Sequence, residues 1–113
     1  MPRDLPIGNG SLLVAFDSQY RLADFYFPRV GMENQAAARF RFGIHSDDET
    51  HWTDDAPWQR TLDYLRDTLV TDVLLQNDAI GIRLRCYDTI DPDANVYVRK
   101  IVVRNLREEA RDL

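Results

Sequence analysis

Alternation of apolar and polar side chains is the feature that most constrains the fold of this chain. In residues 79–87 the apolar side chains Ile80, Ile82, Leu84 and Cys86 recur at every second position. A β-strand points successive side chains to opposite faces, so this spacing places all four on one face. The pattern predicts a strand that is buried on one side.

Similar patterns, separated by polar turn residues, occur along most of the chain. We expect extended structure at residues 12–16, 22–27, 40–45, 51–53, 58–67, 68–75, 79–87 and 96–103. Polar turns are expected at residues 17–19, 46–49, 54–57, 76–78 and 88–95, and a single helical turn at 35–39. The chain is therefore predicted to be all-β, folded as an antiparallel β-sandwich.

The densest pattern is at residues 5–35. A turn signal, Gly8-Asn9-Gly10, opens onto two β-prone runs that short polar residues join, which is typical of a β-hairpin. Pro28 is expected to close the second strand because proline cannot donate to the ladder. The loop that follows, PRVGMENQ, is the part of this stretch that is available for function.

The same stretch resembles a known family of enzymes. The segments IGNGSLLVAFD, LADFYFPRVGMENQ and FRFGIHSDD are similar to the opening of bacterial glucoamylase-type proteins of glycoside hydrolase family 15, which include glucodextranase and trehalase-like members. Gly31 departs from the pattern, because many members carry aspartate there. The resemblance continues, more weakly, through residues 96–106.

This resemblance implies a super-sandwich-like N-terminal β-domain that is truncated here. Residues 1–113 would form that domain or its first part, and the catalytic (α/α) barrel would be absent from this chain. It also supports an extended assignment for residues 58–67, where Trp58, Leu62 and Leu65 are spaced as on a helix as well. The family's catalytic glutamates lie beyond this segment, so the resemblance identifies no catalytic residue here.

Two functions of different classes follow. The first is a noncatalytic domain of a glycoside hydrolase that acts on α-glucosides, which packs against the catalytic domain and shapes its entrance. The alternative is a freestanding β-sandwich that binds carbohydrate or a protein partner. Fold alone does not separate them, because β-sandwiches have many functions.

Two tryptophans are the candidates for carbohydrate binding. Trp52 and Trp58 flank the acidic turn at residues 54–57. An exposed indole beside carboxylates stacks on a sugar ring while the acids bind its hydroxyls. The alternative is that both rings fill the core or an interdomain contact.

A second set of candidates lies where the first hairpin ends. Tyr26, Phe27 and Arg29 lead into Glu33 and Asn34, which present a loop toward a following catalytic domain. Ordinary packing at the end of a strand is the alternative.

Composition limits the remaining possibilities. The chain has 113 residues, enough for one domain, with 44% hydrophobic and 29% charged residues. With 14 basic and 19 acidic side chains, its net charge of −5 argues against nucleic acid as a partner. No apolar run approaches the roughly 18 residues of a membrane span, and no apolar leader precedes the first turn, so we expect a cytoplasmic protein.

Other motifs predict no chemistry. Cys86 is the single cysteine, so no internal disulfide is possible and a buried, inert thiol is expected. His45 and His51 flank Asp47 and Asp48 without the spacing of a metal site, and no metal or cofactor is predicted. If the last strand leaves its edge unpaired, we expect that edge to pair with a second copy of the chain, which would give a homodimer.

Overall fold

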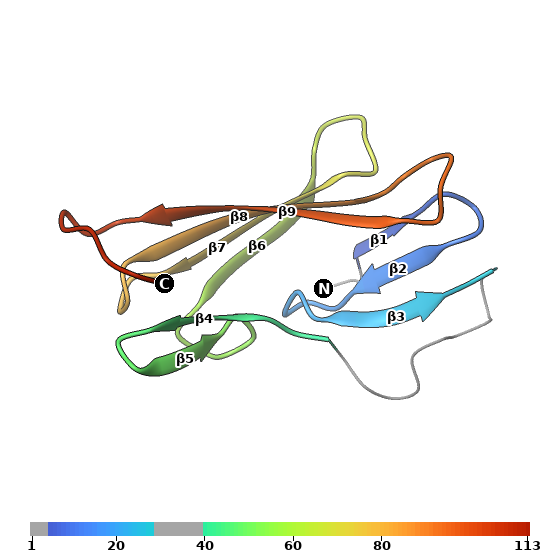
Figure 1. Cartoon of the computed structure of the whole chain (residues 1–113). Helices are drawn as coiled ribbons and strands as arrows, with labels where there is room; N and C mark the ends of the chain where they lie inside the picture. The colour runs from blue at the N-terminus through green and yellow to red at the C-terminus, as the bar shows by residue number, and fades with distance from the viewer. Residues whose placement is uncertain (1–4, 29–39) are drawn as a thin grey trace.

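The computed structural model describes residues 5–28 and 40–113, and its regular structure in this part is β-strand alone. The strands are β1 (Leu5–Gly8), β2 (Leu13–Phe16), β3 (Leu22–Tyr26), β4 (Gly43–Ser46), β5 (Glu49–Trp52), β6 (Gln59–Tyr64), β7 (Thr71–Asn77), β8 (Ile82–Ile90) and β9 (Tyr97–Asn105). They form three antiparallel sheets, ordered β1-β2-β3, β4-β5 and β6-β7-β8-β9 (Figure 1). The prediction of an all-β, sandwich-like antiparallel fold is confirmed.

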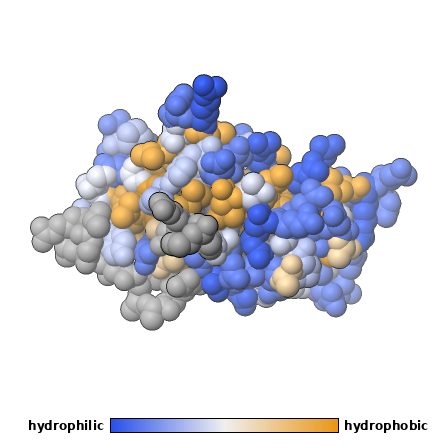
Figure 2. Space-filling view, turned by 180° about the vertical axis from the view of Figure 1, so that it is seen from behind, coloured by the Kyte–Doolittle hydropathy of each residue, from blue (hydrophilic) through white to orange (hydrophobic). Residues whose placement is uncertain are grey.

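The four-stranded sheet forms one layer, and the two smaller sheets lie against its inner face (Figure 1). On β7 and β8 every second side chain points into the space between the layers and is buried. The β1-β2-β3 sheet lies opposite them and contributes the buried side chains of Ile7, Val14 and Phe16. On the face seen from behind, hydrophobic side chains gather across the middle of the molecule (Figure 2).

The first predicted hairpin is present, and it has an additional strand. β2 and β3 pair antiparallel as expected, with a bulge between Ala15 and Phe16. β1, which the sequence did not predict, pairs with the other side of β2. Its Pro6 lies opposite Ala15 on an edge strand, the position in a sheet where a missing N–H is tolerated.

The turn between β7 and β8 lies later in the chain than predicted. Residues 76 and 77 end β7, and the chain reverses over residues 78–81. Gly81 adopts a left-handed backbone with φ of +66°, which glycine allows without steric cost. The Asn77 side chain accepts a hydrogen bond from the Ala79 N–H at 3.1 Å, so it stabilises the turn from within the strand.

β8 is longer than predicted. Asp88, expected to begin a turn, lies inside the strand and is fully buried, and β8 continues to Ile90. The turn begins at Asp91 instead, whose carboxylate accepts the N–H groups of Asp93 and Ala94 at 2.8 and 2.9 Å. These two bonds hold the pKa of Asp91 below its usual range.

The remaining predictions on secondary structure have different outcomes. Residues 58–67 are extended over β6, so the helical alternative is wrong there, and the last strand is present as β9. The expected strand at 40–45 is β4, which begins only at Gly43. The helical turn predicted at 35–39 lies outside the described residues. Within residues 5–28 and 40–113, no helix is long and apolar enough to span a membrane.

Candidate binding site

A buried ion pair joins the last two strands, β8 and β9, beneath the β1-β2-β3 sheet. Asp88 of β8 and Arg99 of β9 are cross-strand partners, and the Arg99 Nε lies 2.8 Å from Asp88 Oδ1. The Tyr20 hydroxyl donates a hydrogen bond to the other carboxylate oxygen. The Asp88 carboxylate thus compensates the positive charge of Arg99 inside the molecule.

Four aromatic rings surround the Arg99 guanidinium. Its central carbon lies 4.8 Å from the ring centroid of Phe42, 5.0 Å from Tyr20, 5.6 Å from Phe16 and 5.7 Å from Tyr97. Cation–π attraction stabilises a charge in such a setting. Burial by itself lowers the pKa of Arg99, whereas the neighbouring Tyr20 and Asp88 raise it. The raising effects are larger, so the pKa of Arg99 lies above its ordinary value.

An open pocket lies next to this cluster. It has a volume of about 240 Å³ and is lined by Leu22, Phe25, Phe40, Arg41, Tyr97 and Arg99. Strands β3 and β9 and the residues that lead into β4 therefore contribute to it. Apolar walls with a few polar groups are typical of small-molecule sites, and this volume lies below the range that holds drug-sized ligands.

Arg41 connects this pocket to one of the predicted tryptophans. Its guanidinium carbon lies 4.2 Å from the Trp52 ring centroid, and its Nη1 lies 3.3 Å from an Asp54 carboxylate oxygen. Trp52 ends β5 and is half-buried. The structure therefore brings together an indole, two guanidiniums and a pocket with aromatic walls.

The charges of the two arginines are each balanced. Asp88 pairs with Arg99, and Asp54 pairs with Arg41. The sequence identified Trp52 but neither arginine as part of a site. The signal available for Arg99 was a cation at an inward-facing position, on the same strand face as Tyr97, Ile101 and Val103.

Trp58 lies elsewhere, in the hydrophobic core. It is 3% exposed, so its indole presents no face to solvent. Packing in the core, one of the two alternatives for this residue, describes its position. A sugar-stacking role in the folded chain is therefore left to Trp52.

The candidate interdomain residues are described only in part. Tyr26 ends β3 and is half-buried, and Phe27, just beyond it, is 38% exposed. Arg29, Glu33 and Asn34 lie outside the described residues. The interdomain role of this loop stays a prediction.

The two histidines lie on one hairpin but on opposite faces. His45 pairs with Thr50 and His51 with Ile44, and cross-strand partners share a face. The described part of the chain holds no group of three or more His, Cys, Asp or Glu side chains that is placed to bind a metal ion.

Comparisons with known proteins give one sequence similarity. The chain is 25% identical over 99 residues to an uncharacterized glycosyl hydrolase of Methanocaldococcus jannaschii. That alignment covers 88% of this chain and 15% of the relative, so the chain spans a small fraction of the relative's length. No family model and no solved structure matches. The similarity indicates a sequence related to glycosyl hydrolases.

Proposed function

We propose that this chain is the noncatalytic N-terminal β-domain of a glycoside hydrolase of the glucoamylase type, which acts on α-glucosides. The observation that carries the proposal is the similarity to a glycosyl hydrolase over 88% of the chain but only 15% of the relative. An all-β chain that corresponds to such a small part of a longer relative has the size and fold expected of an accessory domain. In this role it packs against the catalytic domain and shapes its entrance.

The proposal assigns catalysis to residues outside this chain. Hydrolysis of a glycoside needs two carboxyl groups across the bond, one of them a proton donor with a raised pKa. Glu49, Glu108 and Glu109 are exposed, and Asp88, which is buried, is held in an ion pair. None of the described residues that line the pocket beside Trp52 carries a carboxylate.

The test begins with the reading frame that encodes the chain. Its full product should release glucose from maltose, isomaltose or trehalose, and residues 1–113 alone should release none. Deleting these residues from the full product should lower kcat/KM because the substrate entrance loses one wall. A reading frame that stops after Leu113, or hydrolysis by the 113 residues alone, would contradict the proposal.

A second candidate function is saccharide binding at the pocket beside Trp52. The contact that favours it is Arg41, which lines the pocket and also lies over the indole. Because both arginines have counter-ions, the site suits a neutral polyhydroxyl ligand better than an anion. One sugar ring against the aromatic wall, with guanidinium N–H groups on its hydroxyls, fits this chemistry.

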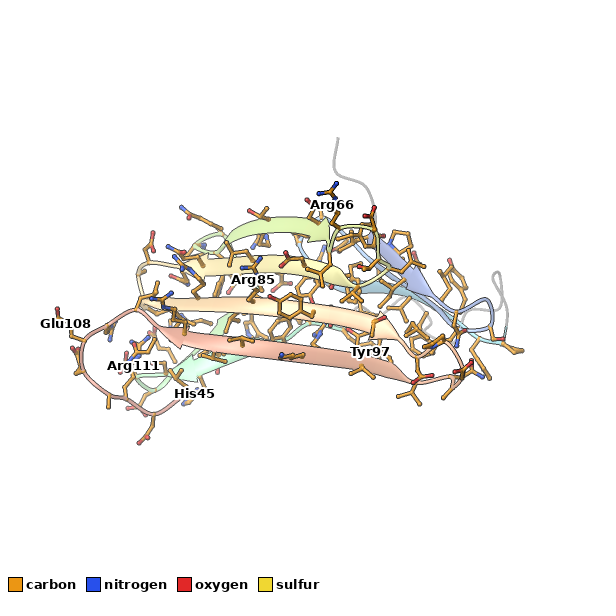
Figure 3. The ribbon with its side chains drawn as sticks, turned by 90° about the horizontal axis from the view of Figure 1, so that it is seen from above. His45, Arg66, Arg85, Tyr97, Glu108 and Arg111 are labelled. Atoms are coloured by element: carbon orange, nitrogen blue, oxygen red, sulfur yellow. The ribbon has the colours of Figure 1, made fainter. Side chains whose placement is uncertain are left out.

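Tryptophan fluorescence tests this second function. We expect saturable quenching with maltose, isomaltose, trehalose or a longer α-glucan, lost in Trp52→Ala and weakened at least tenfold in Arg41→Ala. Trp58→Phe should keep the response, because Trp58 is buried. Arg66→Ala is the matched control for Arg41→Ala, because Arg66, labelled in Figure 3, lies on the turn after β6 and does not line the pocket. A folded chain that responds to no sugar would exclude this function and leave the domain role unaffected.

A further inference from the structure

Among the strands that the structure describes, β9 has one long edge without a paired strand. β9 is the outermost strand of the four-stranded sheet and runs for 9 residues, Tyr97–Asn105 (Figure 3). One edge pairs with β8 over its whole length. In the described part of the chain, no strand pairs with the other edge.

The hydrogen bonds at both ends of the pair show which backbone groups face outward. The Leu106 N–H bonds to the Gly81 carbonyl at 2.8 Å, and the Asp91 N–H bonds to the Val96 carbonyl at 3.0 Å. Hydrogen-bonded pairs alternate along an antiparallel ladder, so the even-numbered residues of β9 bond to β8. The odd-numbered residues, from Tyr97 to Asn105, therefore direct their N–H and C=O groups toward the open edge.

This edge also exposes apolar side chains on both faces of the sheet. Exposure ranges from 39% for Ile101 to 47% for Val103, and Val98 and Val102 on the outer face are similar. Soluble proteins usually protect edge strands with charges, prolines or short length. β6, the opposite edge, is shorter and more polar, with Gln59, Arg60, Thr61 and Asp63 among its six residues.

We propose that β9 pairs antiparallel with β9 of a second copy of the chain, around a two-fold axis at Ile101. In this register Tyr97 lies opposite Asn105 of the other copy, so the strand pairs over its full length. Each cation faces a valine across the interface: Arg99 faces Val103, Lys100 faces Val102, and Arg104 faces Val98. The two sheets become one continuous sheet, and the exposed Ile101 and Val103 of both copies meet on its inner face.

Neighbouring registers are less favourable. The odd-numbered residues of one copy must pair with odd-numbered residues of the other, so the allowed registers differ in steps of two. One step in one direction places Lys100 opposite Lys100, and one step in the other places Lys100 opposite Arg104. Like charges directly opposite each other destabilise a sheet. The register with full overlap is thus also the one without opposed cations.

Oligomeric mass is the first test, and it uses the 113-residue chain itself. Light scattering after size exclusion should give twice the mass of one chain, and Ile101→Lys should give a single-chain mass with unchanged circular dichroism. Leu69→Lys is the matched control, because Leu69 is 61% exposed away from β9, and this variant should stay dimeric. A single-chain mass for the unmodified chain would overturn the proposal. The open edge of β9 would then be available to a strand from another polypeptide segment.

Disulfide trapping tests the register. Lys100 and Val102 would form a non-hydrogen-bonded pair with Cα atoms about 4.5 Å apart, within the range that a disulfide spans. Mixed Lys100→Cys and Val102→Cys chains should therefore cross-link under mild oxidation, whereas each variant alone should not. Rapid cross-linking of either variant alone would overturn the register. Cys86 does not interfere, because it is buried.

Discussion

Asp88 is a buried carboxylate, and both of its oxygens are in contact with neighbouring side chains. It is fully buried, and Arg99 and Tyr20 occupy its two oxygens. Asp88→Asn keeps the shape but leaves the guanidinium without a counter-ion inside the protein. We expect this change to lower the free energy of unfolding by about 3–5 kcal/mol in urea titrations followed by tryptophan fluorescence.

An exposed pair provides the control for that prediction. Asp72 and Arg85 form two hydrogen bonds of 2.9 Å on the outer face of the sheet, where the Arg85 side chain is 52% exposed. Asp72→Asn should cost only about 0–1 kcal/mol, because solvent screens both charges. Equal losses of unfolding free energy for Asp72→Asn and Asp88→Asn would show that burial does not set the contribution of the Asp88–Arg99 pair.

Buried neutral groups determine the response to alkaline pH. Burial raises the pKa of the Cys86 thiol to about 12, and it raises the pKa values of Tyr20 and Tyr97 above their usual range. Below the unfolded pKa values these groups are neutral in both states. Above them the unfolded chain releases protons that the folded chain retains, so stability falls as pH rises.

We therefore expect the free energy of unfolding to decrease between pH 8.5 and 11, by up to about 1.4 kcal/mol per pH unit for each group that ionises only on unfolding. Urea titrations at a series of pH values measure this. Cys86→Ala should remove the part of the decrease that begins near the ordinary thiol pKa. A stability that is constant across this range would contradict the prediction.

At the scale of elements, the β4–β5 hairpin depends on one glycine. A Cβ at Gly43 would lie 2.7 Å from the backbone carbonyl oxygen of His51, on the paired strand. Gly43→Ala should therefore force the strands apart and cost about 1–3 kcal/mol, with faster amide hydrogen exchange in residues 43–52. Glu49→Ala in the same hairpin is exposed and should change stability by less than about 0.5 kcal/mol. Matching exchange rates in the two variants would contradict this role.

The length of β8 shows where local patterns mislead at this scale. An aspartate followed by Asp91-Pro92-Asp93 is typical of a turn, so the local pattern predicts that Asp88 lies in one. Its partner Arg99 is 11 residues away and on another strand. Only the pairing of β8 with β9 brings the two charges together, and that pairing makes a carboxylate compatible with the core.

At the scale of the whole molecule, the proposed dimer links stability to concentration. Association through β9 stabilises the folded state by mass action, so the melting temperature should rise with chain concentration. We expect a higher melting temperature at 200 μM than at 2 μM, measured by circular dichroism. Ile101→Lys should melt at one temperature at both concentrations, whereas Leu69→Lys should keep the dependence. A concentration-independent melting temperature in the unmodified chain would argue against the dimer.

Local patterns in the sequence are sufficient to predict the fold class and the position of most strands, because strand alternation and turn residues act over a few neighbouring positions. It predicted the buried face of β8 and indicated Trp52 as a residue of interest. Three features follow only from the packing of distant strands: Arg99 is enclosed by aromatic rings, Arg41 joins the pocket to Trp52, and Trp58 is buried. The physical reason is that burial of a polar group depends on the layer that covers it, and strands distant in the sequence provide that layer.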